Sequence, residues 1–233
     1  MSYILHIETA TPVCSVSLSY QGQLLEVLEA HEPNIHARSL TVFIDQVLKK
    51  QQLSYNQLDA IAVSMGPGSY TGLRIGVSTA KGLCYALDKP LIAVNTLAAM
   101  AAGFRNLQSV PSTTLLMPMI DARRLEVFTA VFDGQGNAME ATSATTIDED
   151  SLDYLLAAEQ SITLFGSGAD KFADFFPSSK NIHVISGFMN SAVHLIAPAY
   201  AKFKLQDFED VAYFEPFYLK DFLVSTPKKK PLV

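Results

Sequence analysis

The predicted secondary-structure elements of this 233-residue chain occur twice in the same order. In each half, three extended segments precede a helix and two strand–helix units, which gives a βββαβαβα pattern. In the first half, strands are expected at residues 3–8, 13–19, 24–28, 61–65 and 91–94, and helices at 36–51, 72–87 and from 96 onward. In the second half, strands are expected at 115–120, 126–132, in an extended segment ending at 147, at 162–165 and at 182–185, and helices at 148–157, 169–176 and 191–204. This order predicts two α/β lobes.

A duplicated unit of this kind is the layout of the actin-like (ASKHA, ribonuclease H-like) α/β fold. In that fold each lobe contains a mixed sheet with helices on both faces. The join is expected near residues 104–114, which leaves an N-terminal lobe at 1–108 and a shorter C-terminal lobe at 109–233. The two halves show no evident sequence identity, so the repeat is one of pattern only.

The segment 64–76, SMGPGSYTGLRIG, is the most distinctive motif of the chain. An apolar strand ends in a turn of Gly, Pro, Ser and Thr, and a helix follows. Glycines in such a turn indicate positive φ angles or a close backbone approach. The expected structural loop consists of Gly66, Pro67, Gly68 and Gly72. Small residues follow at four-residue spacing on two helix faces, which predicts close packing on both sides. One row is Gly72, Gly76, Ala80 and Cys84, and the other is Ser78, Gly82 and Ala86.

Composition limits the classes of function. The formal net charge is −6, which argues against electrostatic nucleic-acid binding by this chain alone. Only 17% of the residues are charged, which favours a surface partly covered by a partner. Cys14 and Cys84 lie in apolar contexts and are interpreted as reduced, buried thiols of a cytoplasmic protein. No apolar run is long enough to predict a membrane span, and the basic run 228–230 is interpreted as a solvated tail.

Four segments resemble the TsaB (YeaZ) family, and together they extend over nearly the whole chain. They are residues 4–10 with 14–18, residues 66–76 with 80–82, residues 119–128, and residues 216–220. The resemblance implies a non-catalytic scaffold subunit of the bacterial machinery that makes threonylcarbamoyladenosine in tRNA. The implied partners are the catalytic paralogue TsaD, the ATPase TsaE through the complex, and a second copy of the chain, with tRNA contacted only indirectly. One departure is Glu8, because the first strand of the family usually ends in Asp.

The resemblance also implies that the helices of the N-terminal lobe form the partner and dimer surface. The helix at 36–51 has an apolar stripe, which is equally consistent with packing in the core. The residues expected to line the surface are Leu40, Phe43, Val47, Gly76, Thr79, Ala80 and Leu83. Which face of these helices points outward is left open by the sequence.

Catalysis and metal binding are not expected in this chain. The catalytic paralogues resemble it around Val94 and Asn95, and they continue with two histidines four residues apart that hold a metal. This chain has Thr96 and Met100 at those positions, and neither side chain can replace an imidazole. The alternatives are a stand-alone ATP-dependent kinase of the same fold or a glycoprotease-like metallopeptidase. The missing histidine pair argues against the peptidase, and the short second half argues against the kinase.

Two glycine-rich turns could cradle a phosphate group. They are residues 66–72 and residues 166–169, and each comes before a predicted helix. Neither has the lysine pattern of a nucleotide-binding P-loop, so structural turns are the favoured interpretation. No cofactor is expected within this chain, and a nucleotide is considered only at the interface with a partner.

Overall fold

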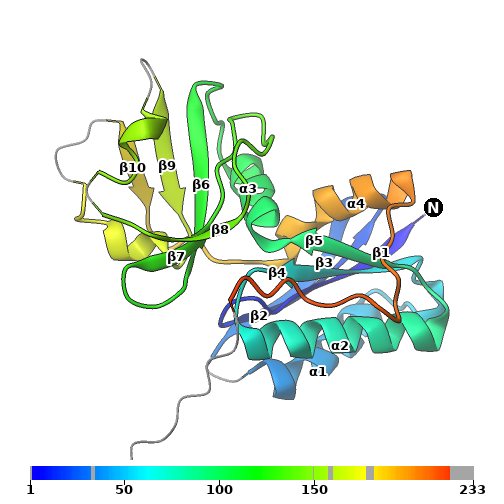
Figure 1. The fold of residues 1–233 in the computed structure, drawn as a ribbon. Helices are drawn as coiled ribbons and strands as arrows, with labels where there is room; N and C mark the ends of the chain where they lie inside the picture. Colours follow the sequence, from blue (N-terminus) through cyan, green and yellow to red (C-terminus); the bar gives the residue numbers. More distant parts are fainter. Residues whose placement is uncertain (1, 33–34, 149, 157–159, 177–180, 221–233) are drawn as a thin grey trace, which may run out of the picture.

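The computed structural model describes residues 2–32, 35–148, 150–156, 160–176 and 181–220. Its strands form two five-stranded sheets, ordered β3-β2-β1-β4-β5 and β10-β9-β6-β7-β8 (Figure 1). The first sheet consists of β1 (Tyr3–Glu8), β2 (Val13–Tyr20), β3 (Gln23–His31), β4 (Ala60–Gly66) and β5 (Leu91–Asn95). The second consists of β6 (Thr114–Asp121), β7 (Glu126–Thr129), β8 (Ser143–Thr146), β9 (Ser161–Phe165) and β10 (Ile182–Ile185).

The two sheets share one connection scheme. In the first, β1 pairs antiparallel with β2 and parallel with β4, and in the second β6 pairs antiparallel with β7 and parallel with β9. The alternating apolar pattern of the meander strands and the continuous apolar runs of β4, β5 and β9 produce this mixed arrangement. The predicted duplicated, two-lobed α/β fold is therefore confirmed.

The helices of the first half follow the sequence pattern closely. They are α1 (His36–Lys50), α2 (Tyr70–Leu87) and α3 (Thr96–Leu107). Helices α1 and α2 cover one face of the first sheet (Figure 1), where Leu40, Val47 and Val77 pack with Leu5 and Val16 of the strands. Helices α2 and α3 each begin at a side-chain cap. The Ser69 hydroxyl accepts a hydrogen bond from the backbone of α2, and the Asn95 carbonyl oxygen accepts from the backbone of α3.

The helices predicted in the second half are shorter than expected. Of the helix predicted at 148–157, the described residues contain only the 3₁₀ turn Asp153–Leu155, and the helix predicted at 169–176 is the 3₁₀ turn Ala169–Phe172. Short helices are marginal unless packing supports them, and the residue before Pro177 avoids helical geometry. The helix predicted at 191–204 is divided into a 3₁₀ turn, Ala192–Leu195, and α4 (Ile196–Leu205). Pro198 explains the division, because proline is tolerated only in the first turn of a helix.

The helices after each sheet also contact the other half of the chain. Helix α3 packs between the two sheets: its Ala99 lies with Ile4 of the first, and its Phe104 packs with Phe165 of the second. Helix α4 follows the second sheet, yet its Ala199 packs with Ile4 and other residues of the first sheet. A division of the chain at 108/109 therefore separates the strands of the two sheets but not the helices that cover them.

The C-terminal strap, defined here as residues 207–220, returns across the first lobe (Figure 1). Its Glu209 N–H donates to Leu91 O of β5 at 2.9 Å, and its Phe217 N–H donates to Met65 O of β4 at 2.8 Å. Its last described residue, Lys220, forms an ion pair with Glu126 of the second sheet. The strap thus contacts both sheets, and the basic run 228–230 lies outside the described residues.

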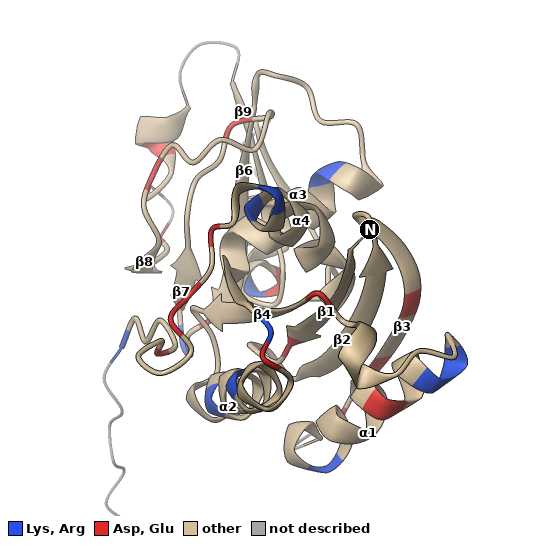
Figure 2. Cartoon of the chain, turned by 90° about the vertical axis from the view of Figure 1, so that its right-hand side faces the viewer, with Lys and Arg blue, Asp and Glu red and all other residues tan. Residues whose placement is uncertain are grey.

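Charged residues are scattered over both lobes in the view of Figure 2, and neither sign covers a whole face. Within the described part of the chain, no helix combines the length and the hydrophobicity needed to cross a bilayer.

Candidate functional site

The glycine-rich loop packs tightly on the turn that joins β1 and β2. A side chain at Gly68 would lie 2.4 Å from Ala10 O, and one at Gly72 would lie 2.1 Å from Thr9 O. Ser69 N–H also donates to Ala10 O at 2.7 Å. Gly66 is the member with a positive φ, 115°, and its backbone faces the strap at Phe217. The Gly66–Pro67 peptide bond is cis. Gly68 and Gly72 are therefore required for close approach, not for a left-handed backbone.

The inner row of small residues on α2 points into the chain itself. Gly76 and Ala80 are buried, and a side chain at Gly76 would meet Thr9 Oγ1 at 2.1 Å. Leu40 and Val47 of α1 are also buried in the core of the first lobe. The prediction that these four residues line a partner surface is wrong for the folded chain, because the sheet already covers them. The other three predicted residues, Phe43, Thr79 and Leu83, are half-buried.

The second row of small residues on α2 faces solvent. Ser78, Gly82 and Ala86 are exposed, and a side chain built at Gly82 would have open space around it. Tyr85 on the same helix is 86% exposed, and Val42 of α1 is 47% exposed. We call these five residues the outer face. It combines small residues with uncovered apolar side chains, which is a composition that suits close helix–helix packing.

A groove of about 370 Å³ lies between α2 and the C-terminal strap. The Tyr70 and Tyr218 rings approach to 4.8 Å between centroids, and the Arg74 guanidinium lies 5.5 Å from the Tyr70 centroid. Lys81 Nζ closes the groove by donating to Phe214 O at 2.7 Å. No sequence pattern predicted this groove, because the contact between α2 and the strap joins residues far apart in the chain.

A second pocket, of about 380 Å³, lies where α1 and α2 begin beside the β1–β2 turn. His36 lines it, and its Nε2 lies 2.9 Å from Thr11 O and 3.2 Å from Val13 O. The imidazole therefore ties the start of α1 to the turn. Its lining residues are Thr11, Pro12, His36, Ala37, Ser69, Thr71, Gly72 and Ile75.

Glu8 lies at the end of β1, at the position where the resemblance expects Asp. The carboxyl is buried, and Oε1 accepts a hydrogen bond from Ala10 N at 2.6 Å. Burial raises the pKa of Glu8 to about 7, while hydrogen bonding from Ala10 and the neighbouring Ser64 and Asn190 side chains opposes the rise. The carboxyl is thus held by its own loop and by both halves of the chain.

Thr96 and Met100, which replace the histidine pair, have structural contacts in this chain. Thr96 Oγ1 lies 2.7 Å from Ser64 Oγ and accepts a hydrogen bond from Gly66 N at 3.1 Å. Met100 is buried in the core between α3 and the second sheet. In the described ranges, three or more His, Cys, Asp or Glu side chains nowhere come together as a metal site. Burial lowers the pKa of His6 to about 3 and that of His194 to about 4.

The two sheets with matched strand order and helices on their faces define a two-lobed protein of the actin-like α/β class. The family model of TsaD, the tRNA N6-adenosine threonylcarbamoyltransferase, matches residues 32–225. The chain is similar to the tRNA threonylcarbamoyladenosine biosynthesis protein TsaB of Haemophilus influenzae, with 36% identity over 125 residues, which are 54% of this chain and 51% of that protein. It is similar to the TsaB of Escherichia coli, with 35% identity over 58% of this chain and 57% of that protein.

A solved structure described as YeaZ from Pseudomonas aeruginosa superposes with a TM-score of 0.77 and 26% identity, covering 94% of this chain and 100% of that one. The chain belongs to the family described by this model, and within it to the TsaB (YeaZ) proteins. The sequence matches to the first three curated relatives span 51–58% of their lengths.

Proposed function

We propose that this chain is a non-catalytic subunit of the machinery that makes threonylcarbamoyladenosine in tRNA, and that it supports a TsaD-type catalytic partner. The observation that carries the proposal is the environment of Thr96. Its hydroxyl bonds to Ser64 and to the Gly66 backbone, and so it holds the glycine-rich loop to the start of α3. In the catalytic paralogues this position belongs to a metal-binding histidine. Here it has a structural role.

Glu8 supports the same proposal. A carboxylate that binds a metal or orients a phosphate-bound metal must be ionised and accessible. Glu8 is buried, and its pKa of about 7 keeps a large neutral fraction at neutral pH. Its carboxyl also accepts a hydrogen bond from Ala10 within the same turn. This arrangement suits a structural carboxyl more than a catalytic one.

The outer face of α1 and α2 is the proposed contact for the catalytic partner and for a second copy of the chain. Gly82 lets a partner helix approach closely, and the Tyr85 and Val42 side chains offer apolar area that the described part of the chain leaves exposed. TsaE is proposed to join through the complex. A nucleotide, if one is required, is proposed to bind at the partner interface and not within this chain.

Reconstitution tests the proposal. The isolated chain is incubated with tRNA and threonylcarbamoyl-adenylate, with and without the catalytic paralogue. We expect no modified nucleoside from the chain alone and efficient modification by the complex. Product from the isolated chain would contradict the proposal, as would full activity of the paralogue without this chain. Partner-free turnover of ATP or peptide would favour the kinase or the peptidase instead.

A further inference from the structure

The turn between β6 and β7 presents two consecutive arginines in a left-handed backbone conformation. Arg123 has a φ of 77° and Arg124 has a φ of 53°, a region that residues with a Cβ atom rarely occupy. Both residues are exposed. Their guanidinium groups have no hydrogen-bond or ion-pair partner among the described residues.

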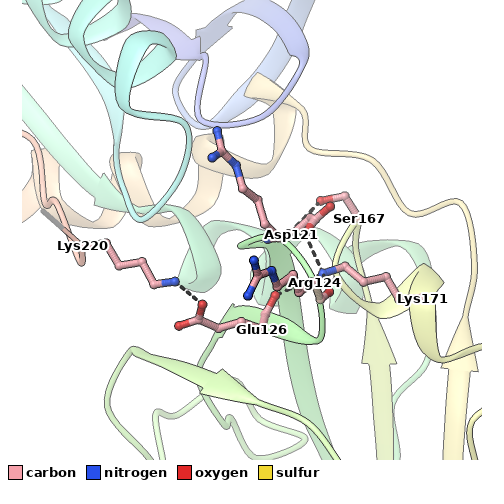
Figure 3. Close-up of polar contacts among 7 residues, drawn as sticks. Asp121, Arg124, Glu126, Ser167, Lys171 and Lys220 are labelled. Carbon is pink, nitrogen blue, oxygen red and sulfur yellow. Dashed lines mark hydrogen bonds and ion pairs between the residues drawn. The ribbon is translucent and has the colours of Figure 1, made fainter. Parts of the chain in front are cut away.

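Other side chains hold the backbone of this turn in place. Asp121 Oδ1 accepts from Arg123 N at 2.7 Å and pairs with Lys171 Nζ at 2.6 Å. Lys171 Nζ also donates to Arg124 O at 2.7 Å. Figure 3 shows Asp121, Ser167 and Lys171 gathered on one side of the turn, and Lys220 reaching Glu126 from the strap. Side chains of Asp121 and Lys171 therefore fix the backbone of the turn.

Both carboxylates of these contacts, Asp121 and Glu126, are already in ion pairs with lysines. Asp121 is paired with Lys171, and Glu126 is paired with Lys220. These two ion pairs leave Arg123 and Arg124 as the cations of the turn that have no ion-pair partner among the described residues. The uncompensated positive charge of the turn therefore lies on their guanidinium groups.

The fold itself does not require arginine at this turn. The β1–β2 turn occupies the equivalent place in the first sheet. It consists of Thr9, Ala10, Thr11 and Pro12, of which only Pro12 is exposed and none is charged. In both halves a glycine that follows the neighbouring parallel strand packs close by: Gly72 lies against Thr9 of the β1–β2 turn, and Gly168 lies against Met119 and Ile120 at the end of β6. The two halves thus share the architecture and differ in the side chains that the turn exposes.

The exposed position indicates the class of ligand. A nucleotide or another small anion is normally enclosed by a pocket, and neither of the two pockets described above is lined by Arg123 or Arg124. A nucleic-acid backbone, in contrast, is bound on open surfaces by arginines that contact successive phosphates. Two adjacent guanidinium groups on a braced turn suit phosphates that are neighbours along a strand.

We infer that the β6–β7 turn binds the phosphodiester backbone of RNA through Arg123 and Arg124. This inference rests on the proposed function for the identity of the RNA, a tRNA held by the assembled complex. The acidic remainder of the chain makes two phosphate contacts insufficient alone, so the turn adds to the binding surface of the partner. It replaces the expectation that tRNA is contacted only indirectly.

The test compares the complex of this chain and its catalytic partner with the same complex carrying R123Q/R124Q. Glutamine keeps much of the side-chain length and removes the charge. K202Q/K204Q on α4 removes the same charge elsewhere and is the matched control. We expect tRNA affinity at ~0.1 M salt to fall by roughly tenfold per arginine, and the slope of log K against log salt to become shallower by about 1–2. The control should change neither. Should the double variant melt at a lower temperature, the single variants carry the test, each with a slope change of about 1.

Photocrosslinking of the wild-type chain alone to thiouridine-containing tRNA keeps this inference separate from the proposed function. It is done at ~0.01 M salt, where even a few phosphate contacts hold RNA long enough to crosslink. Crosslinks within residues 119–128 that disappear in R123Q/R124Q support it even if no catalytic partner binds. Unchanged tRNA affinity and slope in an assembled variant complex would overturn it, and so would crosslinks confined to other segments. The RNA-binding inference would also be overturned if R123Q/R124Q kept its tRNA affinity and lost only assembly with the partner or only ATP binding.

Discussion

Thr9 Oγ1 lies in the space that a side chain on Gly76 would need. A Cβ atom at residue 76 would be 2.1 Å from this oxygen, and the Thr9 hydroxyl donates to Gly72 O at 2.8 Å one turn earlier on the same helix. This contact fixes the face of α2 that packs against the β1–β2 turn. It therefore determines that Gly82, on the opposite row, faces outward.

The first prediction contrasts these two glycines. Gly76→Ala should destabilise the chain by about 1–3 kcal/mol, because the methyl group forces Thr9 and the helix apart. Gly82→Ala should stabilise it by roughly 0.5–1 kcal/mol, because alanine favours the helix and has room there. Urea unfolding followed by circular dichroism measures both. Equal effects of the two substitutions would show that α2 is not oriented as described.

The second prediction concerns the outer face. Gly82→Arg should leave the melting temperature close to that of the wild type and should weaken both self-association and binding of the catalytic partner. A large charged side chain would hold a partner helix away and lose its own hydration. Light scattering and pull-down on the same sample give the two readouts. Ala201→Arg, on an exposed position of α4 away from the outer face, provides a control for added charge. Full assembly of a folded Gly82→Arg chain would move the interface elsewhere.

The third prediction concerns pH. Burial raises the pKa of Glu8 from 4.5 to about 7, so the folded state binds the proton more tightly than the unfolded state does. The resulting cost is absent below pH 4.5, grows as the pH rises, and is complete above about pH 7. Glu8→Gln should therefore gain stability relative to the wild type between these values, by about 3 kcal/mol at most.

Unfolding of both proteins at pH 4.5 and pH 8 measures this difference. The buried imidazole of His6, with its pKa lowered to about 3, acts in the opposite direction but is common to both proteins. It cancels in the comparison. A stability difference between Glu8→Gln and wild type that does not change with pH would show that Glu8 is ionised in the folded chain.

The fourth prediction concerns the strap. Lys81→Met keeps the apolar stem of the side chain and removes the ammonium group that donates to Ala212 O and Phe214 O. Two backbone carbonyls lose a charged donor, so the strap should open more often, at a cost of about 1–3 kcal/mol. Limited proteolysis should cut within residues 207–220 more quickly in this variant. Lys89→Met is the control, and equal cleavage rates in both variants would contradict the assigned role of Lys81.

The sequence by itself determined the order and type of most elements. Period-2 and period-3.6 apolar patterns depend on local burial, and they located both meanders and the three helices of the first half. The same local information overestimated the helices of the second half. At residues 169–176, packing of Phe172 and the following proline decide the outcome. The motifs at 66–76 and 119–128 identified the family correctly. In the first, the glycines are specific to one backbone path, because larger residues would clash with Thr9 and Ala10.

Only the tertiary structure decided which face of each helix is covered. The two small rows of α2 are almost equivalent in sequence, and the choice between them depends on Thr9, which lies far away in the chain and is brought to Gly76 by the pairing of β1 with β4. The groove beside the strap and the bracing of Arg123 and Arg124 by Lys171 likewise join residues distant in sequence. Such contacts depend on the register of the strands and on the path of the C-terminal strap back across the first lobe. Both are properties of the assembled fold and leave no periodic pattern in the sequence.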